Sequence, residues 1–271
     1  MAAFLDNVCF DTIIADCQRQ CLELLPPRSL RVQRSSFDSG NWGRVFHASI
    51  EAWHEPMVLK IMSWPLDNRE FLAQQEAHSK MAHPTAPIKV PNVHHFFRPS
   101  SHYMHPEPYA AVLMDLIYDT RPTSKESLAG DSHIPATLRP APNVHDLLRL
   151  IDVPGTLLHS PYKRYKLMHD ILLAVQQLLP LAHLDLLVPN ILIQENTDGS
   201  LLPAFIDWAF TAHLVPYNNS YEMTLMPHPQ QDSPAQNNYR MMFNSLKGTM
   251  LVLRYEVYHV IDYFQVENTR A

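Results

Sequence analysis

Three oxygen-bearing side chains stand in two short segments of the second half of the chain. Asp185 and Asn190 lie five residues apart in HLDLLVPNILI, and Asp207 follows in PAFIDWAF. Carboxylate and amide oxygens are ligands that Mg²⁺ prefers, and a carboxylate can also orient or deprotonate a reacting hydroxyl. Each residue alone could equally be a loop residue, a turn former or a helix cap. Their order in the chain and the apolar residues that flank them favour one shared functional site over three unrelated structural residues.

The two segments resemble the catalytic loop and the metal-binding segment that protein kinases share with the aminoglycoside and choline phosphotransferases. In that superfamily a His-x-Asp is followed by an Asn five residues after the Asp, and HLDLLVPN keeps both intervals. The resemblance implies phosphoryl transfer from ATP, with Asp185 as the base or orienting carboxylate and Asn190 and Asp207 as Mg²⁺ ligands. ATP and Mg²⁺ are therefore the expected cofactors.

The first half of the chain carries a second part of the same resemblance. SFDSGNWGRVFHA is similar to a glycine-rich loop, in which glycines let backbone amides approach phosphates. A G-x-x-G pair is also an ordinary hairpin turn. Lys60, in VLKIM on the next predicted strand, resembles the lysine that contacts the α- and β-phosphates. The loop residues that match the family pattern are Gly40, Trp42, Gly43 and Val45.

A lysine of this kind is held by an acidic side chain on the following helix. A D-x-x-E capping box that ends at Glu70 predicts a helix from about 68 to 81, and Glu76 lies inside that helix. We expect Glu76 to pair with Lys60. The alternative is a surface pair between Glu76 and Lys80, four residues further on.

The segment AAVLMDL has the apolar character of a strand. The resemblance implies that this strand leads into a hinge between two lobes. The adenine of ATP would then lie beneath Met114 and bond to the backbone near Asp115 and Leu116. A plain core strand is equally consistent with the pattern.

Three positions depart from the protein-kinase pattern. Asp38 replaces the first glycine of the loop and places a carboxylate near the expected phosphates. Leu187 stands where protein kinases carry a Lys and many small-molecule phosphotransferases a polar group. Trp208 and Ala209 replace Phe-Gly, and the small-molecule branch often reads IDW or IDF there. No APE-like segment follows among the 64 residues after Asp207, so we expect a small-molecule acceptor, or no substrate at all, rather than a peptide.

The elements that must position these residues predict an α+β, two-lobed, protein-kinase-like fold. An amphipathic helix over 4–25 precedes short β-type runs, the helix that carries Glu76 and two further strands, and a proline-rich connection leads into a mainly helical remainder. The expected domains are a helical extension over 1–28, an N-lobe with an antiparallel sheet and one main helix over 29–117, and a C-lobe with the catalytic loop over 118–271.

Composition narrows the function classes further. The formal net charge of -6 offers no basic field for nucleic acid or for an anionic membrane. Charge interrupts the apolar stretches well short of the ~20 residues that a membrane span needs. We expect a cytoplasmic protein that binds neither partner. Cys9, Cys17 and Cys21 fall in one predicted helix, which is a poor layout for disulfides.

The leading hypothesis is an ATP-dependent phosphotransferase, similar to the aminoglycoside phosphotransferases, that acts on a hydroxyl of a small molecule. A second is a pseudokinase, a binding or regulatory module that keeps the fold without turnover, and Asp38 and Leu187 motivate it. A third is a kinase-fold enzyme repurposed for nucleotidyl transfer or other biosynthetic chemistry. The sequence leaves the acceptor and the oligomeric state open.

Overall fold

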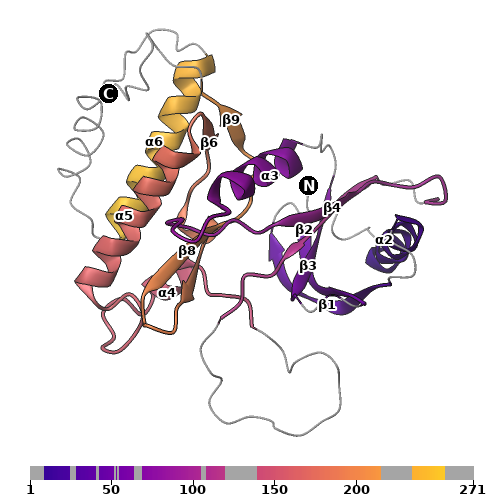
Figure 1. Cartoon of the computed structure of the whole chain (residues 1–271), viewed down its shortest axis with the longest axis horizontal. Helices are drawn as coiled ribbons and strands as arrows, with labels where there is room; N and C mark the ends of the chain where they lie inside the picture. The colour runs from indigo at the N-terminus through magenta and orange to yellow at the C-terminus, as the bar shows by residue number, and fades with distance from the viewer. Residues whose placement is uncertain are drawn as a thin grey trace, which may run out of the picture. The chain divides into compact units, whose positions relative to one another are not determined.

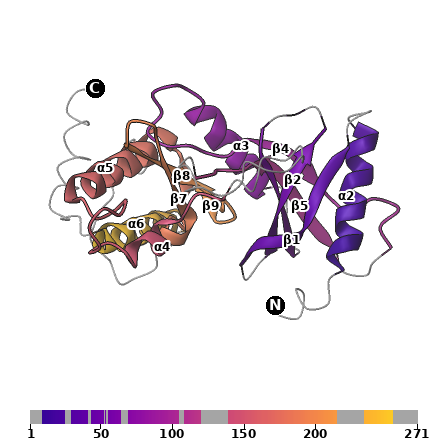
Figure 2. The same ribbon diagram turned by 90° about the horizontal axis from the view of Figure 1, so that it is seen from below.

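The chain forms two compact units, one from residues 1–75 and 91–116 and the other from residues 76–90 and 117–271. Elements of both are drawn in Figures 1 and 2. Among the residues described, no helix is both long and apolar enough to cross a lipid bilayer. The computed structural model describes residues 9–24, 29–40, 43–51, 53, 55–63, 69–104, 108–119, 139–214 and 234–253.

A five-stranded antiparallel sheet forms the centre of the first unit (Figure 1). Its strands are β1 (Leu30–Gly40), β2 (Gly43–Ile50), β3 (Met57–Ser63), β4 (Val93–Phe97) and β5 (Tyr109–Asp115). Their order across the sheet is β1-β2-β3-β5-β4, so the last two strands exchange places relative to their order in the chain. The antiparallel N-terminal sheet predicted from the sequence is confirmed.

Alternation along the strands gives the sheet two different faces. Phe46 and Ala48 on β2 belong to one buried apolar cluster together with Leu59 and Ile61 on β3. Lys60 lies between those two β3 residues, so it points to the opposite face. The strand pattern therefore separates the packing face of the sheet from the face that carries the lysine.

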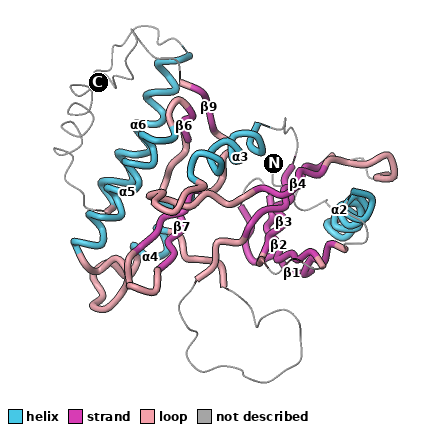
Figure 3. Tube along the Cα trace, in the orientation of Figure 1, coloured by secondary structure: helices cyan, strands magenta, loops and turns pink. Residues whose placement is uncertain are grey.

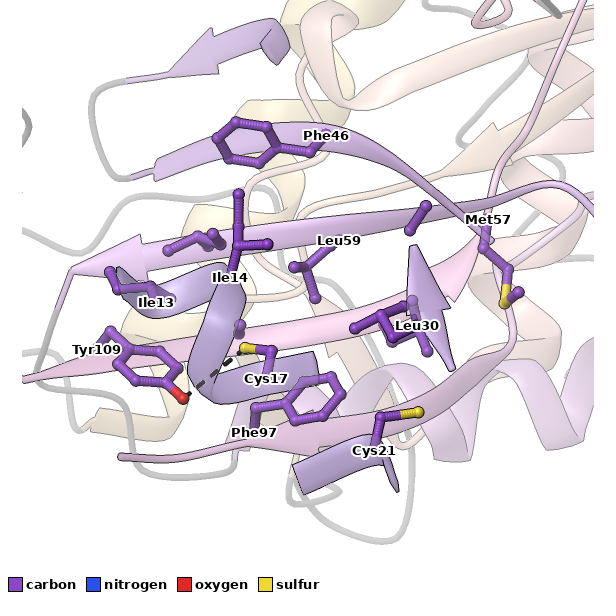
Figure 4. Close-up of a cluster of buried hydrophobic side chains, with 14 of the residues drawn as sticks. Ile13, Ile14, Cys17, Cys21, Leu30, Phe46, Met57, Leu59, Phe97 and Tyr109 are labelled. Carbon is purple, nitrogen blue, oxygen red and sulfur yellow. Dashed lines mark hydrogen bonds between the residues drawn. The ribbon is translucent and has the colours of Figure 1, made fainter. Parts of the chain in front are cut away.

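Helix α2 (Phe10–Leu24) covers the packing face. Figure 4 shows its side chains Ile13, Ile14, Cys17 and Cys21 against the sheet. The predicted N-terminal helix is thus present, and its first and last predicted residues lie outside the described part of the chain. The three thiols are free, as expected, and burial raises the pKa of Cys17 to about 12.

One buried carboxylate ties α2 to the sheet. Asp16 accepts hydrogen bonds from the Tyr109 hydroxyl at 2.6 Å, from the Gln20 amide at 3.0 Å and from the backbone and hydroxyl of Ser100. Burial alone raises the pKa of Asp16, but these hydrogen bonds outweigh burial and hold the pKa below its usual value. The charged form of Asp16 therefore stabilises the first unit.

The second unit combines helices with two short antiparallel pairs of strands. Figure 3 distinguishes its helices from its strands by colour. The helices are α4 (Val144–Leu148), α5 (Pro161–Leu178), α6 (Pro234–Val252) and the 3₁₀ turn η1 (Val188–Asn190), and the strands are β6 (Leu181–His183), β7 (Ile191–Glu195), β8 (Leu201–Phe205) and β9 (Thr211–His213). Strand β6 pairs with β9 and β7 pairs with β8. The predicted α+β class is confirmed.

Helix α5 shows why the local sequence folds as it does. Ser160 caps the helix, because its hydroxyl accepts from the backbone N–H of Lys163, and Pro161 follows in the first turn, where a missing N–H costs nothing. Leu167, Met168 and further apolar residues spaced three or four apart are buried along one side. The helix leads directly into β6 and so fixes where the catalytic loop begins.

We expect Asp16→Asn to lower the free energy of unfolding by about 1–3 kcal/mol near neutral pH, because it weakens hydrogen bonds to a charged acceptor. The folded pKa of Asp16 lies below its usual value. The stabilisation is therefore complete above an ordinary Asp pKa of about 3.9 and is lost as the pH falls through the folded pKa. Urea unfolding of both proteins at about pH 7 and about pH 3 measures the difference.

The matched control for this experiment is Asp11→Asn, which removes an exposed carboxylate from the same helix. Its effect should stay within about 0.5 kcal/mol at both pH values. Equal stability of the wild type and Asp16→Asn near neutral pH would contradict the role given to Asp16.

Candidate active site

Strand register places several of the predicted nucleotide-binding residues on one face of the first sheet. Val45 on β2 lies opposite Lys60 on β3, and Lys60 lies opposite Val112 on β5. Residues two apart on a strand share a face, so Met114 lies on the Lys60 face as well. This face is the one that α2 does not cover. Whether it binds a nucleotide stays a prediction.

Lys60 forms an ion pair with Glu70, the second residue of helix α3 (Arg69–Met81). The Lys60 Nζ lies 2.8 Å from Glu70 Oε1, and the two side chains are only 15% and 6% exposed. The other oxygen, Glu70 Oε2, is buried without a hydrogen-bond partner among the described residues. The predicted pairing of Lys60 with Glu76 is therefore wrong.

Helix phase explains this correction. Glu70 and Glu76 are six residues apart, which corresponds to about 600° of rotation, or about 240° after one full turn, so their side chains lie on different sides of α3. Glu76 instead binds Lys80 Nζ at 3.2 Å and His213 Nε2 at 2.9 Å. The surface pair with Lys80 was the alternative that the sequence left open, and the sequence did not indicate the histidine.

The glycine-rich segment forms the hairpin between β1 and β2. Gly40 and Gly43 are opposite each other at its end. A Cβ on Gly43 would lie 2.3 Å from the carbonyl oxygen of Ile61, which is closer than these atoms can approach. Close packing against β3 therefore requires glycine at position 43, whatever the loop binds. Trp42 and the side chain of Asp38 lie outside the described part of the structure.

The backbone expected to meet adenine is already hydrogen-bonded. The N–H of Asp115 donates to the carbonyl of Asn92 at 3.0 Å, and the N–H of Leu116 donates to the carbonyl of Pro56 at 2.9 Å. A base that used either N–H group would have to displace a bond inside the first unit. Sequence reasoning did not anticipate this, because backbone pairing outside regular strands leaves no mark on residue type.

In the second unit, two pairs of strands bring together the segment expected to be the catalytic loop (184–190) and the segment expected to bind metal (206–210). The catalytic loop joins β6 to β7, and the metal-binding segment joins β8 to β9. Because β6 pairs with β9 and β7 with β8, the two connections meet. The N–H of Leu184 donates to the carbonyl of Phe210 at 2.8 Å and joins them directly.

Three effects act on the pKa of Asp185, which lies in the catalytic loop. Desolvation raises its pKa, a hydrogen bond from Asn190 lowers it, and the charge of Asp207 raises it, so that the pKa lies above the usual value. The Asn190 Nδ2 donates to both the carbonyl and the Oδ2 of Asp185, at 2.8 and 3.1 Å. The three predicted side chains therefore lie together at one place in the second unit.

Buried His183 links the two segments through both of its ring nitrogens. The N–H of Asp185 donates to Nδ1 at 3.3 Å, so Nδ1 is unprotonated and Nε2–H donates to the carbonyl of Ile206 at 2.9 Å. Its ring also packs against Trp208, with 4.8 Å between centroids. In the sequence this histidine is only part of the His-x-Asp motif, and the structure shows that it connects the loop of Asp185 to the strand end that precedes Asp207.

Asp207 has an unusual backbone conformation. Its φ of 62° lies in the left-handed region, which Asp adopts more readily than most residues but still at some cost. The next residue, Trp208, is fully buried and its Nε1–H donates to the carbonyl of Phe205 at 3.2 Å. Strained conformations of this kind concentrate at functional sites.

A third support for the catalytic loop comes from α6. The hydroxyl of Thr249 donates to the carbonyl of Leu186 at 2.9 Å, and Thr249 is 1% exposed. The two residues are 63 positions apart. Sequence reasoning missed this contact, because a lone threonine on a helix carries no signal for a distant loop.

The structure also limits which metal sites are possible. Among the described residues, no three His, Cys, Asp or Glu side chains form a group able to hold a metal ion. The constellation at the two loops consists of two carboxylates and one amide.

Comparison with solved structures finds the Cydia pomonella granulovirus kinase PK-1, with 15% sequence identity and a TM-score of 0.47. The match covers 74% of this chain and 60% of the viral kinase, which is less than two thirds of that protein. No family model and no curated protein matches the chain.

The order of elements agrees with the order that the sequence predicted for a protein-kinase-like fold. The first half of the chain contains a hairpin, then a strand that carries Lys60, and then a helix that carries the paired Glu70. The second half contains a His-x-Asp loop and an aspartate segment between two pairs of strands. Neither the aminoglycoside branch nor the acceptor follows from this order.

We expect Glu70→Ala to cost about 3–5 kcal/mol of unfolding free energy, because it removes the carboxylate from a buried ion pair with Lys60. Glu76→Ala should cost less than about 1 kcal/mol, since its pairs are partly exposed. Chemical denaturation of the two variants separates these cases. Losses of equal size would contradict the pairing described above.

We expect Thr249→Val to speed hydrogen exchange at the amides of Leu187 and Asn190 and to lower the free energy of unfolding by about 1–3 kcal/mol, because the Leu186 carbonyl loses its buried donor. Thr249→Ser keeps the hydroxyl and is the matched control. Hydrogen exchange read by mass spectrometry measures the local effect. Exchange at the loop that is unchanged in Thr249→Val would show that the bond does not hold it.

Proposed function

We propose that the protein is an ATP-dependent phosphotransferase that transfers a phosphoryl group to a hydroxyl of a small molecule. The observation that carries the proposal is the association of Asp185, Asn190 and Asp207 in two joined loops, with the charge of Asp207 raising the pKa of Asp185. Two carboxylates brought near each other disfavour their own ionisation. A divalent cation between them would reverse that effect.

The donor set suits Mg²⁺ chemically. Asp207 and Asn190 offer the hard carboxylate and amide oxygens that Mg²⁺ takes in proteins. Bound Mg²⁺ would neutralise charge on the phosphates of ATP. Asp207 adopts a left-handed backbone conformation that costs it free energy. Such a cost is compatible with a position at which the site requires the carboxylate side chain.

In this proposal each of the remaining residues has a separate task. Asp185 orients the acceptor hydroxyl and receives its proton, and Asn190 holds the Asp185 carboxylate in place. His183 keeps the two loops in register through its two hydrogen bonds. Lys60, held by Glu70, is the expected phosphate contact of the first unit.

A pseudokinase is the second candidate, and one observation favours it. Leu187 is an exposed apolar residue where a cationic or polar donor would assist transfer. This candidate predicts nucleotide binding without turnover, whereas the first predicts both.

We expect ATP with Mg²⁺ to raise the melting temperature of the wild-type protein, since a ligand at about 100 times its dissociation constant stabilises by roughly 2.7 kcal/mol. Asp207→Asn should abolish the Mg²⁺-dependent part of that shift, because it removes a charged metal ligand. Thermal-shift titrations with ATP, with and without Mg²⁺, measure it.

The matched control is Asp198→Asn, in the exposed turn between β7 and β8, where the side chain accepts from the backbone N–H of Ser200 and an amide can do the same. It should leave the shift unchanged. If millimolar ATP with Mg²⁺ gives no shift in the wild type, or if Asp207→Asn keeps the full shift, the proposed function is wrong. A normal shift without product from any acceptor would favour the pseudokinase.

A further inference from the structure

The two loops that carry Asp185 and Asp207 contain two side chains able to donate a hydrogen bond, and both are already used. The Asn190 amide donates to Asp185, and the Trp208 indole donates to the carbonyl of Phe205. Every other residue of 184–190 and 206–210 is apolar or acidic. The loops therefore offer no uncommitted side-chain donor to a polar acceptor or to its further hydroxyls.

Large apolar side chains stand at the surface of the same loops. Leu187 is 42% exposed and Phe210 is 46% exposed, while Leu184, Leu186 and Trp208 are buried. Single exposed apolar residues are common on proteins. What distinguishes this pair is that both belong to the two short loops that hold the reacting carboxylate and the metal ligand.

Backbone contacts tie both exposed side chains to the site. The N–H of Leu187 donates to the carbonyl of Asp185 at 2.8 Å, so a tight turn holds Leu187 next to the carboxylate residue. The carbonyl of Phe210 accepts from the N–H of Leu184, the residue just before Asp185. The next histidine after Phe210, His213, already forms a hydrogen bond with Glu76. Apolar surface, rather than free polar groups, therefore adjoins Asp185 in the described loops.

We propose that the acceptor is an alcohol whose carbon skeleton beside the reacting hydroxyl is apolar, an alkyl or aromatic alcohol rather than a polyol or an aminosugar. This inference rests on the proposed function. A polyhydroxylated acceptor would lose water from its hydroxyl oxygens at these loops without gaining a side-chain donor, and unpaired polar groups are costly. An apolar skeleton would instead remove Leu187 and Phe210 from water.

The transfer itself is balanced with ATP as the donor. The acceptor oxygen forms a bond to the γ-phosphorus of ATP, and the bond from that phosphorus to the β–γ bridging oxygen breaks. ADP leaves, and the hydroxyl proton passes to the Asp185 carboxylate. The products are ADP and a monophosphate ester of the alcohol.

The test compares alcohols of matched carbon number in the presence of ATP and Mg²⁺. Butanol, hexanol and octanol form the apolar series, and erythritol and sorbitol are the polyols that match butanol and hexanol, with kanamycin as an aminosugar. We expect kcat/KM for phosphate-ester formation, read by mass spectrometry, to rise along the apolar series and to exceed that of the matched polyol by about tenfold or more.

Two variants address the apolar residues themselves. Leu187→Ala and Phe210→Ala should each lower kcat/KM for octanol by about tenfold and flatten its dependence on chain length, with little change for sorbitol. Leu150→Ala is the matched control, because Leu150 is a similarly exposed leucine (45%) outside both loops. It should leave all of these values unchanged.

A binding measurement covers the case in which no probe is phosphorylated. Saturation-transfer NMR with ADP and Mg²⁺ present should then show octanol bound to the wild type and weakened in Leu187→Ala. Equal or faster turnover of a polyol or kanamycin, no dependence on chain length, or no binding of octanol would each overturn the proposal. Absence of the thermal shift with ATP and Mg²⁺ in the wild type would instead identify a failure of the phosphotransferase function, so the two failures are distinguishable.

Discussion

Two carboxylates that repel each other are held near one another in the second unit, and much of the surrounding structure serves to keep them there. The charge of Asp207 and desolvation both raise the pKa of Asp185, which means that the ionised pair costs free energy. Three kinds of contact offset this cost: the paired strands β6–β9 and β7–β8, the two hydrogen bonds of His183, and the Thr249 bond to the loop. All three act on the backbone of the loops or of the strands that flank them, and so oppose a separation of the two carboxylates.

The first unit solves a different electrostatic problem. Lys60 points away from the packed face of the sheet and is largely withdrawn from water, so its charge needs a partner. The first turn of α3 supplies that partner, Glu70. The later residues of the same helix bind Lys80 and His213 through Glu76. One helix thus carries two separate acidic contacts, and its phase decides which of them reaches the lysine.

The sequence predicted those features that depend on spacing within one segment. The interval from Asp185 to Asn190, the position of Lys60 in an apolar strand and the α+β order could all be read from residue types, because strand alternation and loop length are local properties. The partner of Lys60 could not, since Glu70 and Glu76 both lie in the predicted helix and a register within ±2 residues changes the face. The Thr249 contact and the hydrogen bonds that already occupy the N–H groups of Asp115 and Leu116 depend on pairing between distant segments. Residue type does not encode such pairing. The sequence suggested that Gly43 lets backbone amides approach phosphates. The close approach of the Ile61 carbonyl is already sufficient to require glycine at this position.

The residue type at position 207 bears on whether the site is functional. Glycine would adopt a φ of 62° without steric cost and would carry no charge, so the fold alone would be better served by glycine there. Aspartate instead brings a backbone cost and raises the pKa of Asp185. In the proposed function a bound cation would offset both costs, because it would attract the two carboxylates.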